Sequence, residues 1–82
     1  MDLLTKIKTK LEQALPGAVV VVKSEASQHQ GHNAGGEHVG AIVTYSGFKD
    51  KSIVEQHQIV YKILENELKK EIHSLRITTK VN

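Results

Sequence analysis

The segment from Ser27 to His38 most constrains how this chain folds, because it reads SQHQGHNAGGEH and is almost free of apolar side chains. Three of the five histidines lie in it, at positions 29, 32 and 38, together with three glycines. A segment of this composition cannot bury enough surface to enter a core. We therefore expect a loop at about residues 24–38 whose imidazoles are available for binding.

The sequence on each side of this loop favours β-structure. Ala18 to Lys23 contains four consecutive valines, a run that is too short and too continuous for a surface helix and is typical of a strand with a buried face. Val39 to Ser46 alternates between two faces, as a second strand does. Together they predict an antiparallel hairpin with the histidine loop at its tip.

An amphipathic helix is predicted from Asp2 to Leu15. Its apolar residues recur at spacings of three and four, while its lysines lie on the opposite face. Asp2 is suited to cap the first turn, and the pair Pro16-Gly17 is a strong signal for the end of the helix.

A second helix is predicted to begin at Ile53, because Ser52 and Glu55 have the spacing of a capping box. A short extra helical turn within residues 49–55 is also compatible with the sequence. We interpret the histidine of the second helix as a packing residue rather than a ligand. The apolar face of this helix is expected to contain Ile53, His57, Val60, Tyr61, Leu64 and Leu68.

After Glu71 the period of the pattern changes, and Ile72 to Lys80 is predicted to be a third strand with His73 at its first inward position. The order of elements is then α-β-β-α-β. We predict an α+β fold, formed by one domain over residues 1–82, in which helices pack on one face of a three-stranded mixed sheet.

The chain contains no cysteine, which excludes a disulfide, a thiolate nucleophile and a metal site built from thiolates of this chain. If the chain binds a metal ion, imidazole must be the main ligand. A small metallohydrolase that uses the histidines with Glu37 would need a water-excluding cleft. Because 82 residues support only one small core, and because the H-E-x-x-H signature is missing, we do not expect an enzyme.

The lysines near the N-terminus do not form a targeting pattern, because Asp2 and Glu12 interrupt the positive charge. The longest apolar run, Ala18 to Val22, is far too short to span a bilayer. We therefore expect the protein to be cytoplasmic and to have no membrane partner.

Four segments together resemble the BolA-like proteins in their order and spacing. The family pattern has a histidine-bearing loop, a phenylalanine after the second strand, an R-H-x-x-V-Y helix motif and an I-H-A-L strand motif. In this chain the loop motif is H-Q-G-H, the helix motif is Q-H-Q-I-V-Y, and the strand motif is I-H-S-L. The corresponding residues are His29–His32, Phe48, Gln56–Tyr61 and Ile72–Leu75. Gln56 thus stands where the family pattern has arginine.

This resemblance implies a class II KH-like fold and a non-enzymatic role with monothiol glutaredoxins in iron–sulfur cluster assembly, transfer or iron sensing. The implied heterodimer shares a two-iron two-sulfur cluster, for which glutaredoxin supplies a cysteine and a bound glutathione. The resemblance assigns His73 as one ligand from this chain. For the second ligand we rank His32 first, His29 next and His38 behind them. The isolated chain is expected to be a monomer without a cofactor.

Imidazole ligation suits this role, because replacing two thiolates by histidines makes a cluster less negative and raises its potential. A solvated polar loop and a His73 bonded to the backbone are the alternatives in which the histidines have no ligand role. The alternative function is that of a transcriptional regulator that binds nucleic acid through a KH-like fold. A net charge of +2 and a single arginine, Arg76, indicate at most weak binding to DNA.

Overall fold

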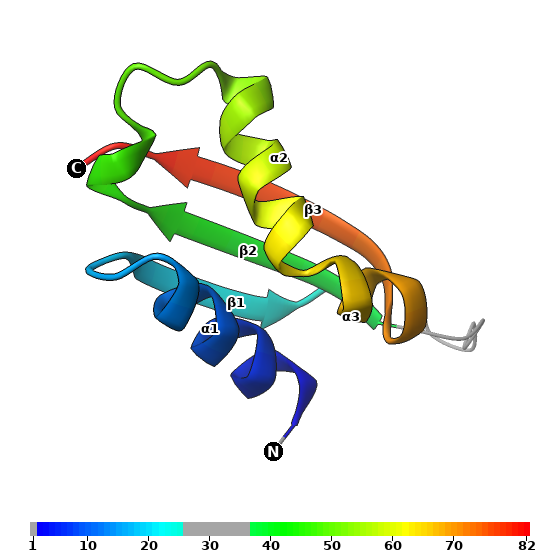
Figure 1. Ribbon diagram of the computed structural model, residues 1–82. Coiled ribbons are helices and arrows are strands. Elements are labelled where there is room, and N and C mark those ends of the chain that lie inside the picture. Colours follow the sequence, from blue (N-terminus) through cyan, green and yellow to red (C-terminus); the bar gives the residue numbers. More distant parts are fainter. Residues whose placement is uncertain (1, 26–36) are drawn as a thin grey trace.

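The computed structural model describes residues 2–25 and 37–82, and over these residues it forms a three-stranded sheet with its helices on one face (Figure 1). The predicted α+β fold with a mixed sheet is therefore confirmed. The elements follow in the order α1 (Leu3–Ala14), β1 (Val19–Ser24), β2 (Glu37–Thr44), the short 3-10 helix η2 (Ser46–Phe48), α2 (Ile53–Ile63), α3 (Glu65–Lys70) and β3 (Ile72–Lys80).

The central strand of the sheet is β2. It pairs with β1 in antiparallel orientation, from Val19 opposite Thr44 to Ser24 opposite Val39. It pairs with β3 in parallel orientation, which is possible because α2 and α3 carry the chain back to the same edge of the sheet. The predicted hairpin is confirmed. Both of its strands extend into the range expected for the loop, since β1 includes Ser24 and β2 begins at Glu37.

Capping groups define the starts of the two long helices, as the sequence predicts. The Asp2 carboxylate accepts a hydrogen bond of 2.8 Å from the N–H of Thr5. Ser52 and Glu55 form both hydrogen bonds of the capping box, at 2.8 and 3.1 Å. These bonds satisfy amide groups that have no partner within the first helical turn.

The inward face of α2 differs from the prediction. Its buried residues are Gln56 and Val60, followed by Leu64 at its end. Ile53 and Tyr61 are instead 59% and 43% exposed. The prediction that Ile53 and Tyr61 lie on the buried face was wrong. The helix is oriented so that Gln56 faces the core, and this orientation places both residues toward solvent.

The helix predicted to continue through Leu68 is divided in two. The first part ends at Ile63, Leu64 has a ψ of 14°, and α3 begins at Glu65. Since Leu64 is fully buried, the change of direction keeps its side chain in the core. The short extra turn is η2, which lies before the predicted residues 49–55 and buries Phe48.

The hydrophobic core lies between the helices and the covered face of the sheet. The opposite face has no helix among the described residues, and Val19 and Val21 are exposed on it. Within residues 2–25 and 37–82 no helix has both the length and the apolar character needed to cross a membrane. The core consists of Ile7, Leu11, Leu15, Val20, Val39, Val43, Phe48, Val60, Leu64, Ile72 and Ile77.

Candidate functional site

The side chains of His38 and His73 lie next to each other at the edge of the sheet where β2 and β3 begin. Their ring centroids are 5.0 Å apart, and the ring planes are inclined by 64°. The two residues come from different strands, which start at the same edge because they run parallel. We call these two residues the histidine pair and treat it as the candidate functional site.

A register shift at the start of β3 determines where His73 points. Glu37 lies opposite Ile72, but His38 lies opposite Ser74, so His73 is an additional residue on β3. Such bulges redirect side chains and are common beside functional sites. Here Ile72 is buried in the core and His73 is exposed. The prediction that His73 faces inward is therefore wrong, because Ile72 takes the buried position.

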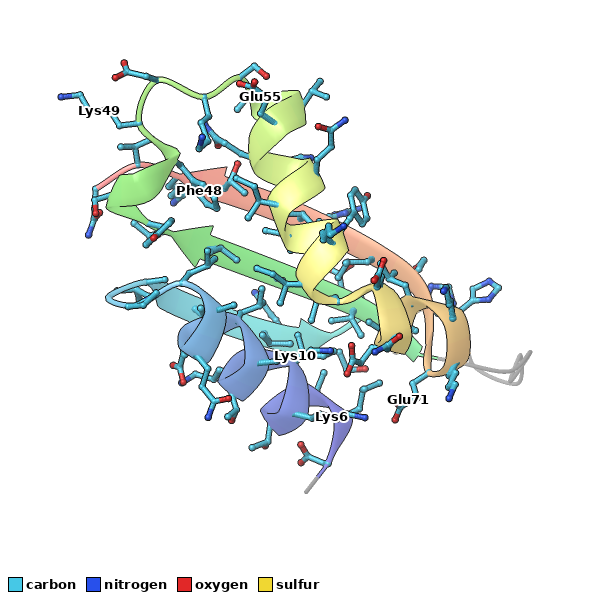
Figure 2. All side chains as sticks on the ribbon, in the orientation of Figure 1. Lys6, Lys10, Phe48, Lys49, Glu55 and Glu71 are labelled. Carbon is cyan, nitrogen blue, oxygen red and sulfur yellow. The ribbon has the colours of Figure 1, made fainter. Side chains whose placement is uncertain are left out.

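Ion pairs between α1 and the segment before β3 hold this edge in place. The Nζ atom of Lys6 is 2.9 Å from a carboxylate oxygen of Glu71, and both residues are labelled in Figure 2. The Nζ atom of Lys10 is 2.9 Å from Oε1 of Glu67, whose side chain is only 4% exposed. These contacts fix the point from which β3, and with it His73, begins.

The fold favours the charged forms of these groups. Burial by itself would raise the pKa of Glu67, but the hydrogen bond from Lys10 and the charges of Lys10 and Lys6 outweigh it, so this pKa lies below its ordinary value of 4.5. The hydrogen bond to Glu71 raises the pKa of Lys6 above its ordinary value of 10.5. The ion pairs of Lys6 and Lys10 hold α3 and Glu71 against α1.

Hydrogen bonds from two neighbouring segments hold His38. Its backbone C=O accepts a hydrogen bond of 2.7 Å from the N–H of Glu25. Its ring atom Nδ1 is 2.7 Å from the hydroxyl oxygen of Ser74. Either group can be the donor in this bond, because a serine hydroxyl both donates and accepts hydrogen bonds.

The spacing of the histidine pair suits two ligands on one metal ion. With metal–nitrogen bonds of about 2.0–2.1 Å and a tetrahedral angle, two imidazole rings on one ion have centroids roughly 5 Å apart. Imidazole is also a suitable ligand for iron. In the part of the chain that the structure describes, no three side chains of the types His, Cys, Asp and Glu converge on a common point. The histidine pair would therefore need further ligands from elsewhere.

The other histidines named from the sequence are placed differently. His29 and His32 lie outside the described residues, so their ranking as ligands stays a prediction. His57 is half-buried on α2, an element that contributes neither member of the histidine pair. The sequence predicts His38 only as the third choice for the second ligand, whereas its ring lies beside that of His73. The available signal was that residues at the starts of neighbouring parallel strands meet at one edge.

Gln56 joins the loop before α2 to the end of β3. Its side chain is 5% exposed, and its amide Nε2 donates to the C=O of Lys51 at 2.9 Å. Its Oε1 accepts a hydrogen bond from the hydroxyl of Thr79. The residue that stands in place of the arginine of the BolA-like pattern thus has its polar atoms engaged inside the fold.

Comparison with known sequences identifies relatives of this chain. The family model described as BolA-like protein matches residues 11–82. The chain is 32% identical over 83 residues to SufE-like protein 1, chloroplastic/mitochondrial, of Arabidopsis thaliana. The aligned region covers 92% of this chain and 22% of that protein. It is 24% identical over 71 residues to the DNA-binding transcriptional regulator BolA of Haemophilus influenzae, covering 87% of this chain and 69% of that protein.

Solved structures share the architecture. The BolA domain of SufE1 from Arabidopsis thaliana has a TM-score of 0.83 at 32% identity, over 95% of this chain and 90% of that chain. BolA1 from Arabidopsis thaliana has a TM-score of 0.85 at 25% identity, over 99% of this chain and 93% of that chain. The aligned part of the chain thus corresponds to 22% of the length of SufE-like protein 1 and to 51% of the length of Protein BOLA1, chloroplastic, of Arabidopsis thaliana. Because the family match covers most of the chain, the chain belongs to the BolA-like protein family.

Proposed function

We propose that this protein is a non-enzymatic partner of monothiol glutaredoxins and that His73 and His38 complete a two-iron two-sulfur cluster shared with glutaredoxin and its bound glutathione. The observation that supports this most is the centroid distance of 5.0 Å between the two rings, in a chain without cysteine. Two imidazoles can occupy two positions on one iron, as they do in Rieske centres. The sulfur ligands must then come from another molecule.

The two histidines have complementary roles in this proposal. His73 is exposed on the bulge of β3 and can reach a partner. His38 is half-buried; the N–H of Glu25 holds its backbone C=O, and the hydroxyl of Ser74 orients its ring. Fixing ligand side chains in advance lowers the entropic cost of forming a site. Ligation by two histidines would give a bound cluster a higher potential than ligation by four thiolates.

The proposal is tested by mixing the protein with a monothiol glutaredoxin, iron, sulfide and glutathione. Visible absorption and circular dichroism are expected to show a heterodimer spectrum distinct from that of the glutaredoxin homodimer. The variants His73→Ala and His38→Ala should each lose this spectrum. His57→Ala is the matched control, since it removes a half-buried histidine outside the histidine pair and should keep the spectrum.

The other outcomes are informative as well. If His38→Ala keeps the heterodimer spectrum while His32→Ala or His29→Ala loses it, the second ligand lies in the histidine loop. If His73→Ala matches the wild type throughout, shared ligation is wrong for this protein. Size-exclusion chromatography of the same mixtures then shows whether a complex forms without a cluster.

A second candidate function is nucleic-acid binding, for which the uncovered face of the sheet offers the cations Lys23, Arg76 and Lys80. Lys23 and Arg76 both lie opposite Gly40 in the register, so they share this face, and the Arg76 side chain is 79% exposed. The name of the Haemophilus influenzae relative also points to DNA. The carboxylate of Glu25, 4.0 Å from Nε of Arg76, offsets part of this charge. Salt-dependent DNA binding that weakens in Arg76→Ala would support this function.

A further inference from the structure

We infer that the uncovered face of the sheet is a docking surface for an acidic amphipathic helix of a partner protein. This inference goes beyond the proposed function and does not depend on the histidine pair. The residues of the face that carry it are the apolar Val19, Val21 and Ile42 and the cationic Lys23, Arg76 and Lys80.

The three apolar residues form one patch on β1 and β2. Val19 and Val21 are 59% and 45% exposed, and the half-buried Ile42 lies opposite Val21 on the central strand. No described helix covers this side of the sheet, as Figure 1 shows. Exposed apolar residues that lie together inside a polar rim are typical of interaction sites. The patch is therefore suited to receive the apolar stripe of another chain.

The three cations lie around this patch. Lys23 and Arg76 are both opposite Gly40 at one end, and Lys80 is at the other end of β3. Glu25 offsets part of the charge of Arg76, at 4.0 Å from its Nε. In residues 2–25 and 37–82 no carboxylate lies within ion-pair distance of Lys23 or Lys80. Two copies of this face would repel each other, so the complementary partner is acidic.

The chemistry of the face favours a protein helix over a nucleic acid. Phosphates could pair with the cations, but the apolar patch offers no aromatic ring on which a base could stack. Arg76 and Lys80 are four positions apart on one strand, which is about 13 Å. Carboxylates seven positions apart on a helix are separated by about 11 Å. A helix can therefore lay its apolar stripe on the patch while its acidic flank reaches both cations.

The test uses a synthetic helical peptide with leucines at spacings of three and four and glutamates at spacings of seven beside them. Proton–nitrogen NMR of the protein during titration locates the contact and gives the Kd. We expect shifts of the amides around Val21 and Ile42, and no binding of the same peptide with lysine in place of glutamate. Arg76→Gln should weaken binding about 2- to 5-fold. Lys49→Gln, in the loop before α2, is the matched control and should leave the Kd unchanged.

A second pair of variants tests the apolar part of the surface. Val21→Thr keeps the β-branched shape and should weaken binding about 3- to 10-fold. Val54→Thr, which changes an exposed valine on α2, should have no effect. The absence of shifts on the uncovered face, equal affinity for the two peptides, or equal effects of the two valine substitutions would each overturn the proposal.

Two further results would replace the partner helix by another occupant. Binding of a single-stranded oligonucleotide to the same amides, tighter than that of the peptide and unchanged by Val21→Thr, would overturn the proposal in favour of nucleic acid. Shifts of these amides on concentrating the protein alone would overturn it in favour of a second copy of the chain.

Discussion

The Nζ atom of Lys10 lies 2.9 Å from Oε1 of Glu67, and this ion pair joins the first helix to the short helix before β3. Because the Glu67 side chain is almost fully buried, its carboxylate depends on Lys10 and Lys6 rather than on water. Glu67→Gln should therefore lower the free energy of unfolding by about 1–3 kcal/mol. Urea unfolding at neutral pH measures this change.

The matched control for this substitution is Glu65→Gln on the exposed start of α3, where the expected change is within about 0.5 kcal/mol. Equal effects of the two substitutions would show that the contacts of Glu67 with α1 add no stability. The comparison isolates the ion pair, since both variants remove one negative charge from the same helix.

The same carboxylate makes stability depend on acidity. The pKa of Glu67 in the folded state lies below its ordinary value of 4.5, so the unfolded chain takes up the proton first. Its contribution is fully present above that ordinary value and is lost as the pH falls through the folded-state pKa. The difference in unfolding free energy between wild type and Glu67→Gln should thus shrink between pH 7 and about pH 3. A difference that is the same at both pH values would contradict this linkage.

Gln56 provides a test of buried hydrogen bonds. Gln56→Ala leaves the hydroxyl of Thr79 and the C=O of Lys51 without their present partner, which should cost about 1–3 kcal/mol in unfolding free energy. Gln58→Ala, on the exposed side of the same helix, should change it by no more than about 0.5 kcal/mol. Chemical denaturation of both variants checks the prediction, and similar midpoints would refute it.

Two glycines should respond differently to replacement by alanine. Gly17 has a φ of 87°, and an alanine in this left-handed conformation should cost about 1–2 kcal/mol. An added Cβ at Gly40 would lie 2.8 Å from Oε2 of Glu25, the end of a flexible side chain that can move aside. Gly40→Ala should therefore change stability by less than about 0.5 kcal/mol. Thermal unfolding of the pair tests this order, and the reverse order would contradict it.

Local signals predicted most of the elements. The cap at Asp2 and the capping box at Ser52 and Glu55 depend on residues three positions apart, and both form as expected. The third strand has its predicted bounds, Ile72–Lys80, because its pattern changes period directly after α3. Such short-range features are encoded in the sequence itself.

The predictions that were wrong concern side chains whose direction is set by contacts between residues far apart in the sequence. Gln56 is buried because Lys51 and Thr79 satisfy its amide, and a pattern of apolar residues cannot reveal that compensation. The outward direction of His73 follows from a one-residue register shift between two strands, which periodicity along one strand does not encode. The contact between His38 and His73 depends on the same long-range pairing.

The parallel pairing of β2 with β3 has a consequence for the folding of the chain. Its two strands are separated by η2, α2 and α3, so the histidine pair forms only after this whole crossover has closed. Long-range parallel pairings of this kind form slowly, because closure entropy must be overcome before their contacts stabilise the chain. A ligand that contacts both rings therefore binds only chains in which this crossover has formed. Its binding lowers the fraction of unfolded chains, which is the fraction that proteases degrade.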